Sequence, residues 1–107
     1  MTPSCSCQEM YEQLIEINKE AFGQSLFEVA YHALAAALHC AIVLEGQTVL
    51  RDLEQRATEQ RDWIEAYALG HPLSTQSALL HRHRSIYTSL VAQIKTRGLM
   101  QQQHPHL

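Results

Sequence analysis

The chain has 107 residues, of which 46% are hydrophobic and 18% charged, and its formal net charge is −3. This length fits one domain with a single core, and three cysteines (Cys5, Cys7 and Cys40) cannot form a disulfide framework. The sequence opens without the basic and apolar segments of a signal peptide, so we expect a cytoplasmic protein in a reducing compartment.

Charge is distributed unevenly along the chain. Residues 1–46 carry six acids and one lysine, whereas residues 71–107 carry no acid. The basic residues of this last part are Arg82, Arg84, Lys95 and Arg97. Four cations beside a net acidic body make a poor phosphate-binding surface, so we do not expect nucleic acid to be the main partner. A nucleic-acid-binding regulator that uses these four residues is kept as an alternative.

The first predicted helix covers residues 7–22. Ser6 is followed three residues later by Glu9, which is the pattern of a capping box. Large apolar residues then recur at helical spacing, and Gly23 is expected to end the helix. The short turn that follows predicts an antiparallel hairpin with the next helix.

The second predicted helix, residues 26–45, is the most apolar stretch of the chain. Ser25 and Glu28 predict a second capping box, and Gly46 suits the position just beyond the helix end. Apolar residues cover most of its circumference and leave a narrow polar edge that includes His32 and His39. We therefore expect a central, buried helix, and the same polar residues argue against a membrane span.

Two further helices are predicted over residues 49–69 and 75–97. The first has an apolar seam in which Gln60 fills the one polar position. Gly98 is expected to end the second, leaving residues 99–107 as a tail. The pattern predicts an all-α fold: a single helical domain over residues 1–107, arranged as a four-helix up-and-down bundle.

The first hairpin, over residues 10–42, resembles a single tetratricopeptide (TPR) unit. The residues that match the family's pattern of large and small side chains are Leu14, Ile17, Ala21, Phe27, Ala30, Leu34 and Ala37. Asn18 stands where the family usually has glycine, and Ile42 lies near its expected proline. The resemblance implies a TPR-like hairpin followed by two further helices, in a module that binds peptides or proteins without catalysis.

The seven histidines raise the question of a ligand or metal site. His32 and His39 are seven residues apart, which places them about 10 Å apart on one helical face, too far for one ion without a third element between them. His83 falls on the inward stripe of the last helix. We expect it at the edge of the core, bonded to Gln60 or Tyr67. The alternative is a bundle that holds a small ligand or metal through His83, His32 or His39.

Catalytic residue patterns are missing from the sequence. The four glycines are each expected to end a helix, which leaves none for a phosphate-binding loop, so we expect neither an enzyme nor a bound cofactor. The leading hypothesis is a small protein-interaction domain, an adaptor or scaffold, that binds a protein partner or itself as a homodimer. Aromatic residues and arginines are enriched at interfaces, so its expected contacts are Trp63, Tyr67, Arg82 and Arg84.

Overall fold

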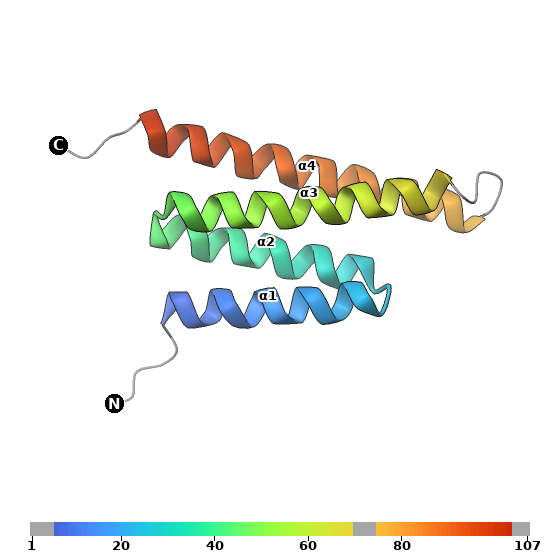
Figure 1. Ribbon diagram of the computed structural model, residues 1–107, viewed down its shortest axis with the longest axis horizontal. Coiled ribbons are helices and arrows are strands. Elements are labelled where there is room, and N and C mark those ends of the chain that lie inside the picture. Colours follow the sequence, from blue (N-terminus) through green and yellow to red (C-terminus); the bar gives the residue numbers. More distant parts are fainter. Residues whose placement is uncertain (1–5, 70–74, 104–107) are drawn as a thin grey trace.

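The computed structural model describes residues 6–69 and 75–103, with side chains described for residues 6–67 and 82–100. The described chain is built of four helices and contains no strand (Figure 1). The helices are α1 (Cys7–Gly23), α2 (Phe27–Leu44), α3 (Gln47–Leu69) and α4 (Thr75–Gln103). The predicted all-α helical bundle is confirmed.

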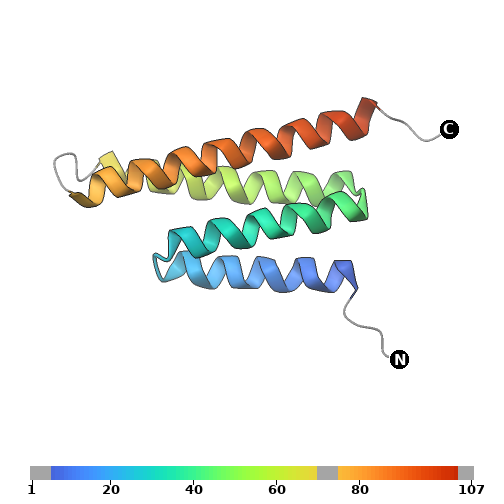
Figure 2. The same ribbon diagram turned by 180° about the vertical axis from the view of Figure 1, so that it is seen from behind.

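Each helix runs antiparallel to the one before it, and the bundle is flattened. Its principal extents are 54 × 36 × 15 Å. α1 packs mainly on α2, and α3 mainly on α4, while α2 contacts all three other helices. α1 and α4 form opposite edges (Figure 1), and the view from behind shows α2 and α4 on the nearer side (Figure 2). We call these two sides the α1–α3 side and the α2–α4 side.

The two predicted capping boxes have different outcomes. At α1 the box is present: the Ser6 hydroxyl accepts from the Glu9 N–H at 3.1 Å, and the Glu9 carboxylate accepts from the Ser6 N–H at 3.0 Å. The box predicted at Ser25 is wrong, because α2 begins after Leu26 without a side-chain cap. Ser25 has a φ of 62° and its N–H bonds the Phe22 carbonyl, while the Leu26 N–H bonds Ala21. Ser25 therefore closes the end of α1 in a Schellman motif and is not available to start α2.

The predicted glycine helix ends are also corrected. At the end of α2 the left-handed position is taken by Glu45, with φ 54°, and not by Gly46. α4 passes through Gly98 and ends at Gln103, so residues 99–103 of the predicted tail are helical. The residues after Gly98 are good helix formers, and the Gln47 side chain donates to the Gly98 carbonyl at 3.4 Å. Gly70, expected to end the third helix, and residues 104–107 of the predicted tail lie outside the described residues.

The core is apolar and α2 lies at its centre, as predicted. Leu34 and Ala37 of α2 are fully buried, as are Leu53 and Ile64 of α3. More of α2 than its polar edge meets water, because Val43 is 71% exposed. Within the described residues, α2 is long and apolar enough to cross a membrane by length and composition alone. Its packing against three helices also fits the core helix of a folded bundle.

Candidate interaction surfaces

A buried polar network links the four helices near the middle of the bundle. The Asn18 amide on α1 donates to the Ala30 carbonyl on α2 at 2.8 Å and to the Gln60 side chain on α3 at 3.0 Å. Gln60 donates back to Asn18 at 2.6 Å. On α4, the Tyr87 hydroxyl donates to Gln60 at 2.8 Å. All four helices therefore contribute a hydrogen-bonding group to the network around the Asn18 and Gln60 amides.

This network is structural. Asn18 and Tyr87 are completely buried, and no buried side-chain nitrogen or oxygen in the described residues lacks a partner. Burial raises the pKa of Tyr87. The sequence signalled both amides separately, Gln60 as the polar position of the α3 seam and Asn18 as a departure from the TPR pattern. Their pairing across 42 residues became visible only in the fold.

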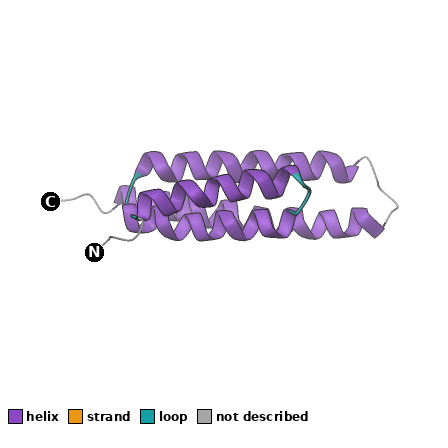
Figure 3. Cartoon of the chain, turned by 90° about the horizontal axis from the view of Figure 1, so that it is seen from below, coloured by secondary structure: helices purple, strands orange, loops and turns teal. Residues whose placement is uncertain are grey.

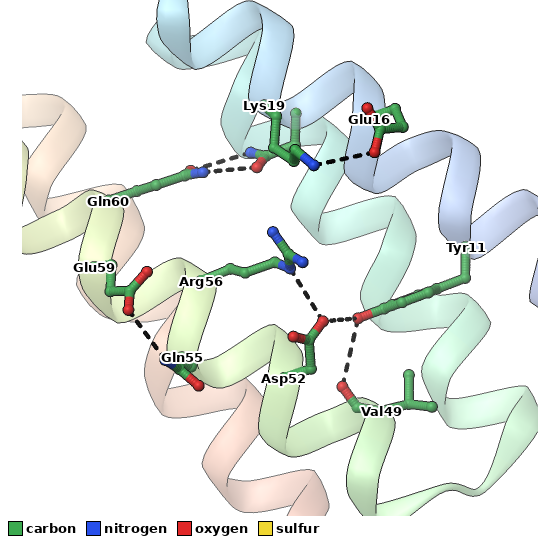
Figure 4. Close-up of polar contacts among 10 residues, drawn as sticks. Tyr11, Glu16, Lys19, Val49, Asp52, Gln55, Arg56, Glu59 and Gln60 are labelled. Carbon is green, nitrogen blue, oxygen red and sulfur yellow. Dashed lines mark hydrogen bonds and ion pairs between the residues drawn. The ribbon is translucent and has the colours of Figure 1, made fainter.

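A second polar cluster ties α1 to α3 (Figure 4). The Tyr11 hydroxyl donates to the Asp52 carboxylate at 3.0 Å, and Arg56 pairs with the same oxygen at 3.0 Å. Burial raises the pKa of Tyr11, and the bond to Asp52 and its charge raise it further, against a lowering effect of Arg56. A hollow of about 270 Å³ beside the cluster is lined mainly by polar and charged side chains. The α1–α3 side is thus held by hydrogen bonds within the chain.

Aromatic side chains gather where the α1–α2 turn meets α3. We call Phe22, Phe27, Trp63 and Tyr67 the aromatic shelf. Trp63 lies edge-on to Phe22, with ring centroids 5.5 Å apart, and Tyr67 stacks on Trp63 at 5.1 Å. Phe27 is buried, but Trp63 is 46% and Tyr67 37% exposed. The structure therefore brings together two predicted contact residues, and two phenylalanines that the prediction missed support them.

The shelf joins Phe22 and Phe27, which flank the α1–α2 turn, to Trp63 of α3. α3 and α4 extend past this turn (Figure 3). On α4, His83 lies against Phe27 of the shelf and the neighbouring Arg82 is exposed, while Arg84 pairs with Glu65 of α3 at 3.9 Å. Arg82 is thus the arginine next to the shelf, since Glu65 and its partner Arg84 lie on another face of α3 from Trp63 and Tyr67. A surface of this composition is typical of protein interfaces, in which aromatic side chains and arginine are enriched.

His83 lies at the edge of the core, against the ring of Phe27 at 5.8 Å. The predicted partner Gln60 is instead bonded to Asn18 and Tyr87. Burial lowers the pKa of His83, and Arg82 lowers it further, whereas Glu28 raises it. His83 is therefore favoured in its neutral form.

The other two predicted ligands, His32 and His39, are exposed on α2. The described residues contain no group of three or more His, Cys, Asp or Glu side chains that could hold a metal ion. The structure therefore does not gather the three histidines into one site. Among the cysteines, Cys7 approaches the Cys40 carbonyl at 3.7 Å, and burial followed by contact with Cys7 raises the pKa of Cys40.

A groove of about 560 Å³ separates α2 from α4 on the α2–α4 side. Its apolar lining includes Leu38 and Ile42 from α2 and Met100 from α4, while His39 and Arg97 supply polar groups. Of the four basic residues of α4, Lys95 pairs with Glu54 of α3 at 3.9 Å, like Arg84 with Glu65. No ion pair of Arg97 is found among the described residues. We call this feature the α2–α4 groove.

Comparison with known proteins gives no relative for this chain. No family model, no curated protein and no solved structure matches it.

Proposed function

We propose that this protein is a non-enzymatic interaction domain, an adaptor or scaffold, that binds a protein partner through the aromatic shelf. The main observation behind this proposal is the stacked pair of Trp63 and Tyr67. Both side chains are exposed, although Trp63 packs edge-on against Phe22. Such rigid, half-buried rings supply contact area at low entropic cost and often dominate the energy of an interface. The resemblance of residues 10–42 to a TPR hairpin is compatible with this function.

The chemistry of the partner follows from the surroundings of the shelf. Arg82 is exposed on α4 next to His83, whose ring lies against Phe27 of the shelf. An apolar segment flanked by acidic residues complements this surface, because its side chains can pack on the rings while a carboxylate reaches Arg82. We propose a peptide or helix of that kind, in the cytoplasm, where the free thiols of Cys7 and Cys40 fit a reducing compartment.

Paired variants test the shelf. The double variant Trp63→Ala, Tyr67→Ala should lose a specific partner that the wild-type protein captures, because truncating a central aromatic anchor costs roughly 2 kcal/mol or more of binding energy. Gln55→Ala is the matched control on the same helix, since Gln55 is exposed and bonds only to Glu59. Quantitative pull-down followed by titration with the purified partner measures the effect. Equal binding by the double variant and the control would contradict the proposal.

A further inference from the structure

Two cysteines that lie 33 positions apart in the sequence meet at the open end of the α1–α2 hairpin. Cys7 is the first residue of α1, and Cys40 lies one turn before the end of α2. These two helix ends lie at the same end of the bundle (Figure 1). The Cys7 sulfur is 3.7 Å from the Cys40 carbonyl oxygen. The Cys7 side chain therefore points from α1 towards Cys40 on α2.

The surroundings of Cys40 allow the two helices to pack closely. Ala37 and Ala41, on either side of Cys40 in α2, are fully buried, and small side chains at a contact shorten the distance between helix axes. The two thiols also interact with each other. Burial raises the pKa of Cys40, and a hydrogen bond with the Cys7 side chain raises it further. Two thiols in contact on closely packed helices can form a disulfide without a large movement of the backbone.

Both thiols are free and partly exposed, so a small oxidant can reach them. In a reducing compartment, a disulfide of this kind is usually transient and senses the redox state. The oxidant we consider is oxidised glutathione. The thiolate of one cysteine attacks a glutathione sulfur, forms a mixed disulfide and releases one glutathione thiolate. The thiolate of the other cysteine then attacks the protein sulfur of this bond and releases the second glutathione. The cysteine pair loses two electrons and two protons, which the two glutathione molecules take up.

We propose that Cys7 and Cys40 form a reversible redox site, which closes into a disulfide and fastens the start of α1 to α2 when oxidised glutathione accumulates. α1 is an edge helix that packs mainly on α2, so this bond secures its first turn. Tyr11, one turn further along α1, bonds Asp52 of α3. The disulfide thus holds the part of α1 that is bonded to α3. The inference does not depend on the aromatic shelf, because the shelf lies at the α1–α2 turn, the other end of the hairpin.

Oxidation of the full chain carrying Cys5→Ser tests the site, because this variant keeps only the two proposed thiols. Under oxidised glutathione the folded protein should lose the mass of two hydrogens. Trypsin, which cleaves after Lys19, should then release two peptides joined through Cys7 and Cys40. The melting temperature (Tm) should rise by at least about 5 °C, because a cross-link over 33 positions restricts the unfolded chain. Reduced glutathione should reverse both changes.

Cys7→Ser and Cys40→Ser, each made in the Cys5→Ser chain, are the controls. Each keeps a single thiol and should gain at most one glutathione, without the rise in Tm. Four outcomes would overturn the proposal. The folded chain could keep both thiols reduced, or it could carry glutathione on both cysteines without closing the bond. The disulfide could form only in urea. The oxidised folded chain could melt no higher than the reduced one.

Discussion

The two sides of this bundle differ in what fills the space between neighbouring helices. On the α1–α3 side, hydrogen bonds cross from helix to helix, through Tyr11 and Asp52 and, deeper, through Asn18 and Gln60. On the α2–α4 side the helices leave a groove beside an exposed face of α2, on which Val43 is 71% exposed. Polar groups that already have hydrogen-bond partners within the chain add little free energy of binding to another molecule. Burial of exposed apolar surface adds much more. The comparison therefore shows that hydrogen bonds within the chain fill the α1–α3 side, whereas apolar surface stays uncovered on the α2–α4 side.

The largest expected effect comes from breaking the buried network. Asn18→Ala removes two donors and one acceptor, and it leaves the Ala30 carbonyl and the Gln60 amide without their partner in a dry site. We expect a loss of about 3 kcal/mol in the free energy of unfolding. Urea denaturation should show a lower midpoint with an unchanged m-value.

A matched control defines the meaning of that result. Gln55→Ala removes an exposed amide with a single hydrogen bond and should change the unfolding free energy by less than about 0.5 kcal/mol. If Asn18→Ala were no more destabilising than this control, the network would not hold the four helices together. The difference between the two sides would then depend on the hydrogen bonds of the Tyr11 cluster alone.

A smaller effect is expected from the protonation of His83. Its pKa in the fold is lowered by burial, so as the pH falls below its ordinary value of about 6.5 the unfolded chain takes up a proton before the folded one. This residue therefore supports stability above that pH, and the support is lost as the pH falls toward its folded pKa. His83→Leu should make the unfolding free energy fall less steeply between pH 7 and pH 5. Parallel curves for the two proteins would contradict this assignment.

Local features of the fold could be predicted from the sequence. The helix-forming residues and apolar spacing gave the all-α fold, and the first three helices begin and end within two residues of their predicted bounds. The capping box at Ser6 was predictable because all of its atoms lie within one turn. The stacking of Trp63 on Tyr67 was also local, since residues four apart on a helix share a face.

Other features depend on contacts between distant parts of the chain. The continuation of α4 through Gly98 is accompanied by a hydrogen bond from Gln47, 51 residues away. Ser25 looked like a cap, but the last carbonyls of α1 take up the backbone N–H groups of this turn. The amide pair of Asn18 and Gln60 and the α2–α4 groove likewise depend on how the helices pack. Spacing along the chain carries no information on these contacts.

The role of the aromatic shelf can be measured most directly by titrating a partner captured by the wild-type protein against two variants. The double variant Trp63→Ala, Tyr67→Ala should bind this partner at least roughly tenfold more weakly, because the two exposed, stacked rings carry the proposed contact. Gln55→Ala changes an exposed residue of α3 and should bind like the wild-type protein. Equal binding by the double variant and by Gln55→Ala would contradict the proposed role of the shelf.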